Sequence, residues 1–338
     1  MPMYEAIEKA IKTMQAAQAQ LAEKLDIPAI EALIIVLEAL NRQNDDAFNE
    51  LEQADRKFIR QTLKESDFNT LTPEQKRQVL QLVLVATMQE DKLQGNYQVT
   101  PDAIGMWVTF FVEAFLNPQQ TSQVLDITVG SGNLLATVNL ALQQRGDTTT
   151  YYGVENDDTL ITIASGVAAL LGLDWQLDHQ DALADTPDLS DKMDVVVADL
   201  PVGYYPKELD AGYQTVVEDG LTYVHHLLIE KVMETLRPGG LGLLIVPAHL
   251  FESEQAPQLL KYFQNDGIYF QGFIQFSDKL FLDKQASKAL LLVQKPGADA
   301  VQAEPVMLAK APDVGQKEEN LNFVNQMQTW LADNHLSH

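Results

Sequence analysis

The sequence predicts an α/β protein in which a parallel sheet follows an all-α segment and ends in an antiparallel pair of strands. Apolar residues recur at helical spacing from Tyr4 to Leu93, and the first glycine of the chain is Gly95. From Val124 onward, short apolar runs alternate with helical stretches, which is the pattern of a parallel sheet. The last two apolar runs have no helix between them. Strands without a crossover helix pair in the antiparallel sense.

The first segment is expected to form a separate helical domain. Its clearest helices run from Ala29 to Leu40 and from Val79 to Met88. Thr72 followed by Pro73 is typical of a helix N-terminus, and Asn44 to Asp46 is typical of a turn between helices.

Domain bounds follow from a candidate linker at Gln94-Gly95-Asn96. The helical domain is expected over 1–94, the sheet domain over 95–297 and a tail over 298–338. Within the tail, apolar residues between Asn320 and Leu331 fall on one broad face, which predicts a helix.

The elements of the sheet domain are predicted from hydrophobic pattern and turn signals. The continuous apolar run at 193–200 (MDVVVADL) is typical of a strand that is buried on both faces. The helix at 223–236 is expected to stop at Arg237-Pro238-Gly239-Gly240. Further strands are expected at 124–127, 149–155, 175–181 and 241–247, and a helix at 157–171. The antiparallel pair is expected at 268–276 and 288–295, joined by the polar loop 277–287, at one edge of the sheet.

The turn after the first strand has the features of a cofactor-binding loop. Asp126 closes the strand, Gly130 and Gly132 allow close backbone approach, and the next helix offers free amides. A dinucleotide site would need a third glycine where Leu135 stands, and Asp126 would repel a phosphate. The acidic residue suits the positively charged S-adenosylmethionine better. The alternative is an ordinary tight turn.

A second acidic residue, Glu155, ends the following strand, a little over 20 residues beyond the glycines. This is roughly the offset at which a second strand reaches the ribose of a bound nucleotide. Glu155 is therefore a candidate for binding the ribose hydroxyls.

These residues resemble those of class I S-adenosylmethionine-dependent methyltransferases, and in particular the N6-adenine DNA methyltransferases that form the modification subunits of type I restriction systems. The resemblance covers residues 97–295. The family loop D-P-A-C-G-S-G stands here as D-I-T-V-G-S-G at 126–132, and Thr100-Pro101 resembles the segment that closes over the methionine end of the cofactor. The resemblance implies a Rossmann-like sheet that binds S-adenosylmethionine.

The resemblance also places Asp181-Ala182 beside the adenine of the cofactor, although an aspartate that closes a strand is just as often a turn residue. The expected cofactor-binding residues are Thr100, Asp126, Thr128, Gly130, Gly132, Asn133, Glu155, Asn156, Asp181 and Ala182. No metal ligands are expected.

The segment Asp199-Leu200-Pro201-Val202-Gly203-Tyr204-Tyr205 occupies the place of the family's Asn/Asp-Pro-Pro-aromatic catalytic motif. Asp199 would supply a side-chain acceptor and Leu200 a carbonyl acceptor for an exocyclic amine, and Pro201 would restrict the turn. Such catalysis is mainly positioning. Leu200 replaces the family's first proline and Val202 its aromatic residue. Tyr204 or Tyr205 could stack on the target base, and Tyr204 is the leading candidate. The alternative is a site that binds the cofactor without turnover.

Composition excludes several other chemistries. The chain has no cysteine, which argues against cysteine-adduct methylation of pyrimidines, iron–sulfur radical chemistry and disulfides. The six histidines, among them His225, His226 and His249, lack metal-ligand spacing and are expected in surface or boundary positions. No apolar run is long enough to span a membrane, so a cytoplasmic protein without a membrane partner is expected.

The net charge restricts the partners. The 48 acidic and 23 basic residues give a formal charge of −25, which would repel DNA at long range. About forty residues follow Lys295, too few for a separate recognition domain. The leading expectation is methylation of adenine N6 in nucleic acid, with sequence recognition left to a partner protein, and a homodimer is also compatible with the chain. The alternatives are methylation of a protein glutamine, or a cofactor-binding interaction protein without turnover.

Overall fold

The computed structural model describes residues 3–42, 48–49, 51–93, 99–183, 189–207, 212–281, 286–297 and 299–338. The turn predicted at Asn44 to Asp46 and the linker predicted at Gln94-Gly95-Asn96 lie outside these residues.

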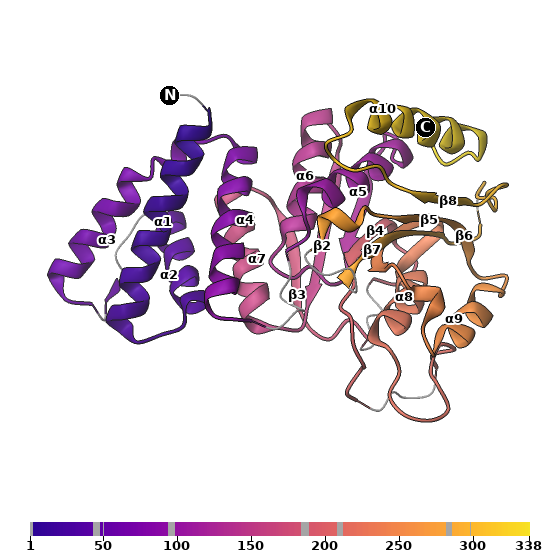
Figure 1. The fold of residues 1–338 in the computed structure, drawn as a ribbon, viewed down its shortest axis with the longest axis horizontal. Coiled ribbons are helices and arrows are strands. Elements are labelled where there is room, and N and C mark those ends of the chain that lie inside the picture. Colours follow the sequence, from indigo (N-terminus) through magenta and orange to yellow (C-terminus); the bar gives the residue numbers. More distant parts are fainter. Residues whose placement is uncertain are drawn as a thin grey trace.

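The N-terminal part is helical, as predicted. It contains α1 (Met3–Leu25), α2 (Ala29–Arg42), α3 (Gln53–Glu65) and α4 (Pro73–Glu90). Helix α4 begins with a capping box in which the Thr72 hydroxyl accepts the Gln75 amide and the Gln75 side chain accepts the Thr72 amide. In Figure 1 these helices form the left part of the molecule, and α4 lies against α7 of the sheet part.

The sheet contains eight strands in the described residues, in the order β3-β2-β1-β4-β5-β7-β6-β8. The strands are β1 (Ser122–Asp126), β2 (Thr149–Glu155), β3 (Trp175–His179), β4 (Met193–Asp199), β5 (Leu236–Pro247), β6 (Tyr269–Gln275), β7 (Lys288–Gln294) and β8 (Met307–Lys310). Strands β1 to β5 are parallel, and β7 is antiparallel to both β5 and β6. The predicted fold class is therefore confirmed.

Two details of the sheet differ from the prediction. Strand β8 was not predicted, and it pairs in parallel with β6, so the antiparallel pair does not occupy the edge of the sheet. A four-residue strand with one half-buried face carries too weak a pattern to be read from the sequence. Strand β5 begins at Leu236, not at Leu241, because Leu236 pairs with Met193 before the register shifts at the Pro-Gly-Gly segment.

Helices cover both faces of the sheet. They are α5 (Asp102–Phe115), α6 (Asn133–Arg145), α7 (Asp158–Leu171), α8 (Val224–Thr235), α9 (Ala256–Phe263) and α10 (Lys317–Asp333). Alternate residues of β4 point to opposite cores. Val195 and Val197 pack with α5, α6 and α10, whereas Val196 and Ala198 pack with α8 and α9. A strand buried on both faces explains its continuous apolar run.

The helical part and the sheet part share buried side chains. The core of α1 to α4 continues into Ala136 of α6 and into Ile163 and Val167 of α7. A Cβ at Gly166 of α7 would lie 3.3 Å from the side chain of Leu37 of α2. Helix α4 itself contacts both α6 and α7, which places it next to the glycine turn that precedes α6. No helix in the described residues is long and apolar enough to cross a membrane.

Candidate functional site

A cavity of about 830 Å³ opens at the carboxyl ends of β1, β2 and β4. This is the edge of a parallel sheet at which ligands commonly bind. Of the predicted residues, the cavity is lined by Thr100, Asp126, Thr128, Gly130, Asn133, Glu155, Asn156, Asp181, Ala182, Asp199, Leu200, Pro201 and Tyr204. The fold therefore brings together residues that are up to about a hundred positions apart in the chain.

The glycine turn is held by Glu155. Its Oε2 accepts the amide of Gly130 at 2.9 Å, and its Oε1 accepts the amides of Asn156 and Asp157 at 2.9 and 3.0 Å. Gly130 has a φ of +53°, which favours glycine. A carboxylate oxygen accepts more than one hydrogen bond, so Glu155 keeps acceptor capacity for a ligand.

Gly132 has a different position from the other predicted residues. It has a φ of +83° and is not among the residues that line the cavity. A Cβ here would lie 2.7 Å from the ring of Trp175 and 3.5 Å from the Cα of Ala164. The glycine is therefore required by backbone conformation and packing.

Two acidic side chains at the cavity have raised pKa values. Burial raises the pKa of Asp126 well above its usual range, and the nearby Asp199 and Glu155 add to the effect, although the Thr128 amide opposes it. Burial also raises the pKa of Glu155, against the three amides that bind it. Within the described part of the chain, no ion pair joins either residue to a lysine or arginine. Neither carboxyl group therefore has a cationic partner among the described residues, and a bound ligand could supply one.

Asp181 joins the expected adenine side of the cavity to the catalytic motif. Its Oδ2 accepts the Tyr205 hydroxyl and the Lys207 ammonium, both at 2.8 Å, and its Oδ1 accepts the Leu183 amide at 3.1 Å. Burial alone would raise its pKa, but the bonds from Lys207, Tyr205 and Leu183 together lower it. Asp181 therefore has more contacts than an ordinary turn residue, and it anchors the segment that follows Pro201.

Asp199 lies at the end of β4 with both carboxylate oxygens bound. Oδ1 accepts the ammonium of Lys288 at 2.6 Å, and Oδ2 accepts the Thr100 hydroxyl at 2.9 Å. Its backbone carbonyl accepts the Thr128 hydroxyl at 3.4 Å. The next residue, Leu200, is buried, and its amide donates to the carbonyl of Ile245 at 3.0 Å. This pairing fixes the backbone where the motif leaves the sheet.

Sequence reasoning missed Lys288. It is the first residue of β7 and lies opposite Pro247 at the carboxyl end of β5, which brings its ammonium to the cavity. The one available signal was a lysine at the start of an otherwise apolar strand, which alone does not identify its partner.

The aromatic residues of the motif form a small exposed stack. Tyr204 packs on Tyr223 with ring centroids 4.8 Å apart and an interplanar angle of 19°. The hydroxyls of both residues donate to Glu254 Oε1, at 2.8 and 3.3 Å. Gly203, with a φ of +142°, makes the turn, and Tyr204 remains 49% exposed at the cavity. A planar target group can reach this position.

The histidine prediction was wrong for two of the three residues named. His225 and His226 are buried, because α8 packs both rings beneath Tyr223. Within the described residues, His225 Nδ1 and both nitrogens of His226 have no hydrogen-bond partner. Burial lowers the pKa of His225 to about 3 and that of His226 to about 4. His249 is exposed, as expected. No cluster of potential metal ligands is found in the described ranges.

Comparison with known proteins identifies a matching family and a relative that is similar over most of its length. Residues 81–334 match the model of the family described as N-6 DNA Methylase. The uncharacterized protein YtxK of Bacillus subtilis (strain 168) is 31% identical over 316 residues, which cover 93% of this chain and 94% of that protein.

Solved structures are similar as well. A Listeria monocytogenes protein, described provisionally as a class I S-adenosylmethionine-dependent methyltransferase, is 28% identical with a TM-score of 0.85, over 96% of this chain and 99% of its own. The methyltransferase subunit of a type I restriction-modification system from Streptococcus thermophilus has a TM-score of 0.59 at 13% identity, over 96% and 78% of the two chains, and shows the fold alone. The fold, the cavity and the family match agree that this chain belongs to the N-6 DNA Methylase family and has the class I methyltransferase fold.

Proposed function

We propose that this chain transfers the methyl group of S-adenosylmethionine to a conjugated nitrogen, with N6 of adenine in DNA as the leading acceptor. The observation that carries the proposal is the position of Asp199, whose side chain reaches the cavity from the end of β4 beside the glycine turn. The methyltransferase family and fold support an enzyme.

The residues at the cavity fit S-adenosylmethionine. Among the described residues, no lysine or arginine forms an ion pair with Asp126 or Glu155, and the cofactor carries one positive charge on its sulfur and one on its amino group. A Cβ at Gly130 would meet only the Thr128 carbonyl oxygen, at 4.0 Å, so the glycine leaves open space for a ligand.

Each group of residues along the cavity wall is assigned to one part of the cofactor. Asp126, with Thr100, Thr128 and Asn133, would hold the methionine end. Glu155 and Asn156 would hold the ribose, and Asp181 and Ala182 the adenine. When bound, S-adenosylmethionine supplies an electrophilic methyl group on a positively charged sulfur.

The Asp199 carboxylate and the Leu200 carbonyl would act on the acceptor nitrogen. They accept hydrogen bonds from its two N–H groups and so turn its lone pair, otherwise delocalised into the ring, toward the methyl carbon. The nitrogen becomes positively charged as it takes the methyl group and then releases one proton to water. The attraction of Asp199 strengthens as this charge develops, which lowers the barrier. Each carboxylate oxygen has two acceptor positions, so Lys288 and Thr100 leave capacity on both.

Tyr204 would provide the stacking surface. It is the exposed aromatic residue of the motif, and its contact with Tyr223 orients the ring. Stacking on a tyrosine suits a flipped base or a planar amide.

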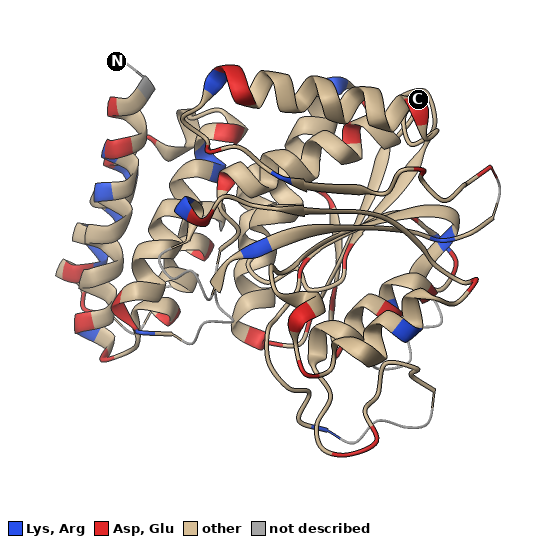
Figure 2. Cartoon of the chain, turned by 45° about the vertical axis from the view of Figure 1, so that its right-hand side comes forward, with Lys and Arg blue, Asp and Glu red and all other residues tan. Residues whose placement is uncertain are grey.

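A second acceptor class, the side-chain amide of a protein glutamine, is favoured by the charges of the site. The described cavity wall contains two lysines, Lys207 and Lys288, and each is paired with an aspartate. Acidic positions recur over helices and connecting loops (Figure 2). A phosphate backbone finds no unpaired lysine or arginine on this wall, whereas a peptide needs none. Nucleic acid binding would therefore depend on a partner protein or on a second subunit.

The decisive experiment titrates the purified chain with S-adenosylmethionine and then supplies labelled cofactor with duplex DNA, RNA or total protein. We expect cofactor binding, label transfer to one acceptor class, and weak unaided binding to DNA at physiological salt. Asp199→Ala is the matched control. It should lower transfer by about 100-fold or more by removing a transition-state acceptor, with a much smaller effect on cofactor affinity. Cofactor binding without transfer to any class would favour an interaction protein without turnover.

A further inference from the structure

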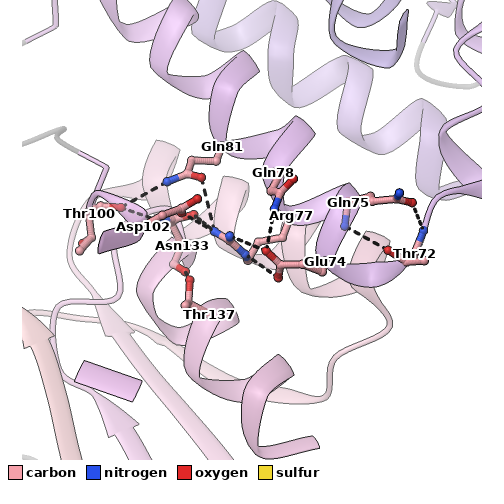
Figure 3. A network of polar contacts seen from close by, with 10 residues as sticks. All are labelled: Thr72, Glu74, Gln75, Arg77, Gln78, Gln81, Thr100, Asp102, Asn133 and Thr137. Atoms are coloured by element: carbon pink, nitrogen blue, oxygen red, sulfur yellow. Dashed lines mark hydrogen bonds and ion pairs between the residues drawn. The ribbon is translucent and has the colours of Figure 1, made fainter. Parts of the chain in front are cut away.

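Two side chains of the helical part contact residues that line the cavity. Both come from α4, where the guanidinium of Arg77 is buried and the amide of Gln81 is half-buried. Figure 3 shows them between α4 and the residues that begin α5 and α6.

Arg77 joins three elements. Its Nε and Nη2 donate to the two carboxylate oxygens of Glu74, at 3.0 and 2.7 Å. Its Nη1 donates to Asp102 in the first turn of α5 at 3.0 Å, and lies 3.4 Å from Oδ1 of Asn133 at the start of α6. The planar guanidinium therefore sets the relative position of three helices.

The same network ends at Thr100. The Thr100 carbonyl accepts the side-chain amides of Asn133 at 2.9 Å and Gln81 at 3.3 Å. The Thr100 hydroxyl in turn donates to Oδ2 of Asp199 at 2.9 Å. One residue thus lies between α4 and the carboxylate at the centre of the site.

The exposure of the charged side chains indicates that this network fixes the relative positions of the helices and adds little to the stability of the fold. Glu74 and Asp102 keep 51% and 45% of their side chains exposed, so water would solvate them without Arg77. The buried guanidinium, at 5% exposure, has lost its own water, and the ion pairs mainly offset that loss. What remains is a fixed geometry, because a planar donor with several partners has few alternative positions.

We propose that Arg77 and Gln81 are positioning residues for methyl transfer, and that the helical part completes the cofactor site through the Thr100 segment. The inference rests on the proposed function of the cavity. Without the contacts from α4, Thr100 would lose one of the two donors that hold its carbonyl, and its hydroxyl would hold Asp199 less firmly.

The test compares two glutamines of the same helix in the full chain. Gln81→Ala removes the donor to Thr100, whereas Gln78→Ala removes a side chain that donates to Glu74 and is also half-buried. We expect Gln81→Ala to weaken S-adenosylmethionine binding about three- to tenfold in calorimetry, as for a lost hydrogen bond, with a urea midpoint like that of Gln78→Ala. Arg77→Met should weaken binding at least as much, and Arg77→Lys should restore part of the loss. Equal cofactor affinity in Gln81→Ala and Gln78→Ala would overturn the inference.

A second measurement needs no cofactor. Amide hydrogen exchange over 99–105 should become faster in Gln81→Ala than in Gln78→Ala, because the Thr100 carbonyl has lost a partner. If the wild-type chain did not bind S-adenosylmethionine, the proposed function would fail, but exchange would still test the link from α4 to Thr100. Unchanged exchange over 99–105 in Gln81→Ala would overturn that link.

Discussion

The ammonium of Lys288 lies 2.6 Å from Oδ1 of Asp199, and the two side chains are only 13% and 14% exposed. The pair joins the start of β7 to the end of β4, across β5. Burial raises the pKa of Asp126, and the negative charges of Asp199 and Glu155 raise it further. Lys288 places a positive charge beside Asp199 at this end of the cavity.

Removing one member of this ion pair should lower the free energy of unfolding more than removing both members. Lys288→Met leaves Asp199 without its ion pair, and we expect a loss of about 1–3 kcal/mol in the free energy of unfolding. Combining Lys288→Met with Asp199→Asn should recover much of that loss in urea titrations. As a control, Lys310→Met removes an exposed pair with Asp278 and should change stability by less than about 0.5 kcal/mol. Additive losses in the double variant would argue against coupling.

The cofactor loop offers a comparison between two glycines. Gly130 and Gly146 both have positive φ values, +53° and +93°, but only Gly130 lines the cavity. Gly130→Val and Gly146→Val should therefore carry a similar backbone cost of about 1–2 kcal/mol. Only Gly130→Val should weaken S-adenosylmethionine binding, because its side chain would enter the ligand space. Calorimetry on both variants decides the point, and equal affinities would argue against a cofactor at this loop.

Tyr204 should act through its ring and not through its hydroxyl. We expect Tyr204→Ala to raise the KM for the acceptor by the loss of about 1–3 kcal/mol of stacking. Tyr204→Phe should have nearly wild-type kinetics, since its hydroxyl binds Glu254 at an exposed position. Tyr4→Ala, at a position that is 77% exposed in α1, serves as the control. A large defect in Tyr204→Phe would instead assign a role to the hydroxyl.

The buried histidines should make the fold sensitive to acid. Burial lowers the pKa of His225 to about 3 and that of His226 to about 4 in the native state, against 6.5 when exposed. As pH falls below 6.5, the unfolded chain takes up protons that the native state does not. The free energy of unfolding should therefore fall, by about 2 kcal/mol per histidine between pH 7.5 and 5.

Variants isolate this contribution. In His226→Phe the loss of stability between pH 7.5 and 5 should be smaller by the share of one histidine, whereas the exposed His249→Phe should leave it unchanged. The raised pKa values of Asp126 and Glu155 make the free energy of unfolding rise as pH falls, but they do so equally in wild type, His226→Phe and His249→Phe. The same pH dependence in wild type and His226→Phe would contradict the assignment.

The sequence alone determined the fold class and the local motifs, because these signals lie within short stretches of chain. A strand that ends in Asp126 and runs into glycines, and the apolar run that ends in Asp199, are contiguous patterns. Their order also predicted the parallel strands and the antiparallel pair, which are confirmed, although the pair does not lie at the edge of the sheet. The assignment of individual residues to cofactor and acceptor stays a prediction, although thirteen of the fourteen predicted site residues line one cavity and Gly132 does not.

The tertiary structure decided which distant side chains complete the site. Lys288 is 89 positions from Asp199, and Gln81 lies in α4, 19 positions before Thr100, which precedes α5. Periodicity therefore carries no signal for either contact. It also decided that His225 and His226 are buried, since a helical pattern does not say how many of its faces other elements will cover. Such contacts depend on how helices and strands pack against each other, and that packing is a property of the whole chain.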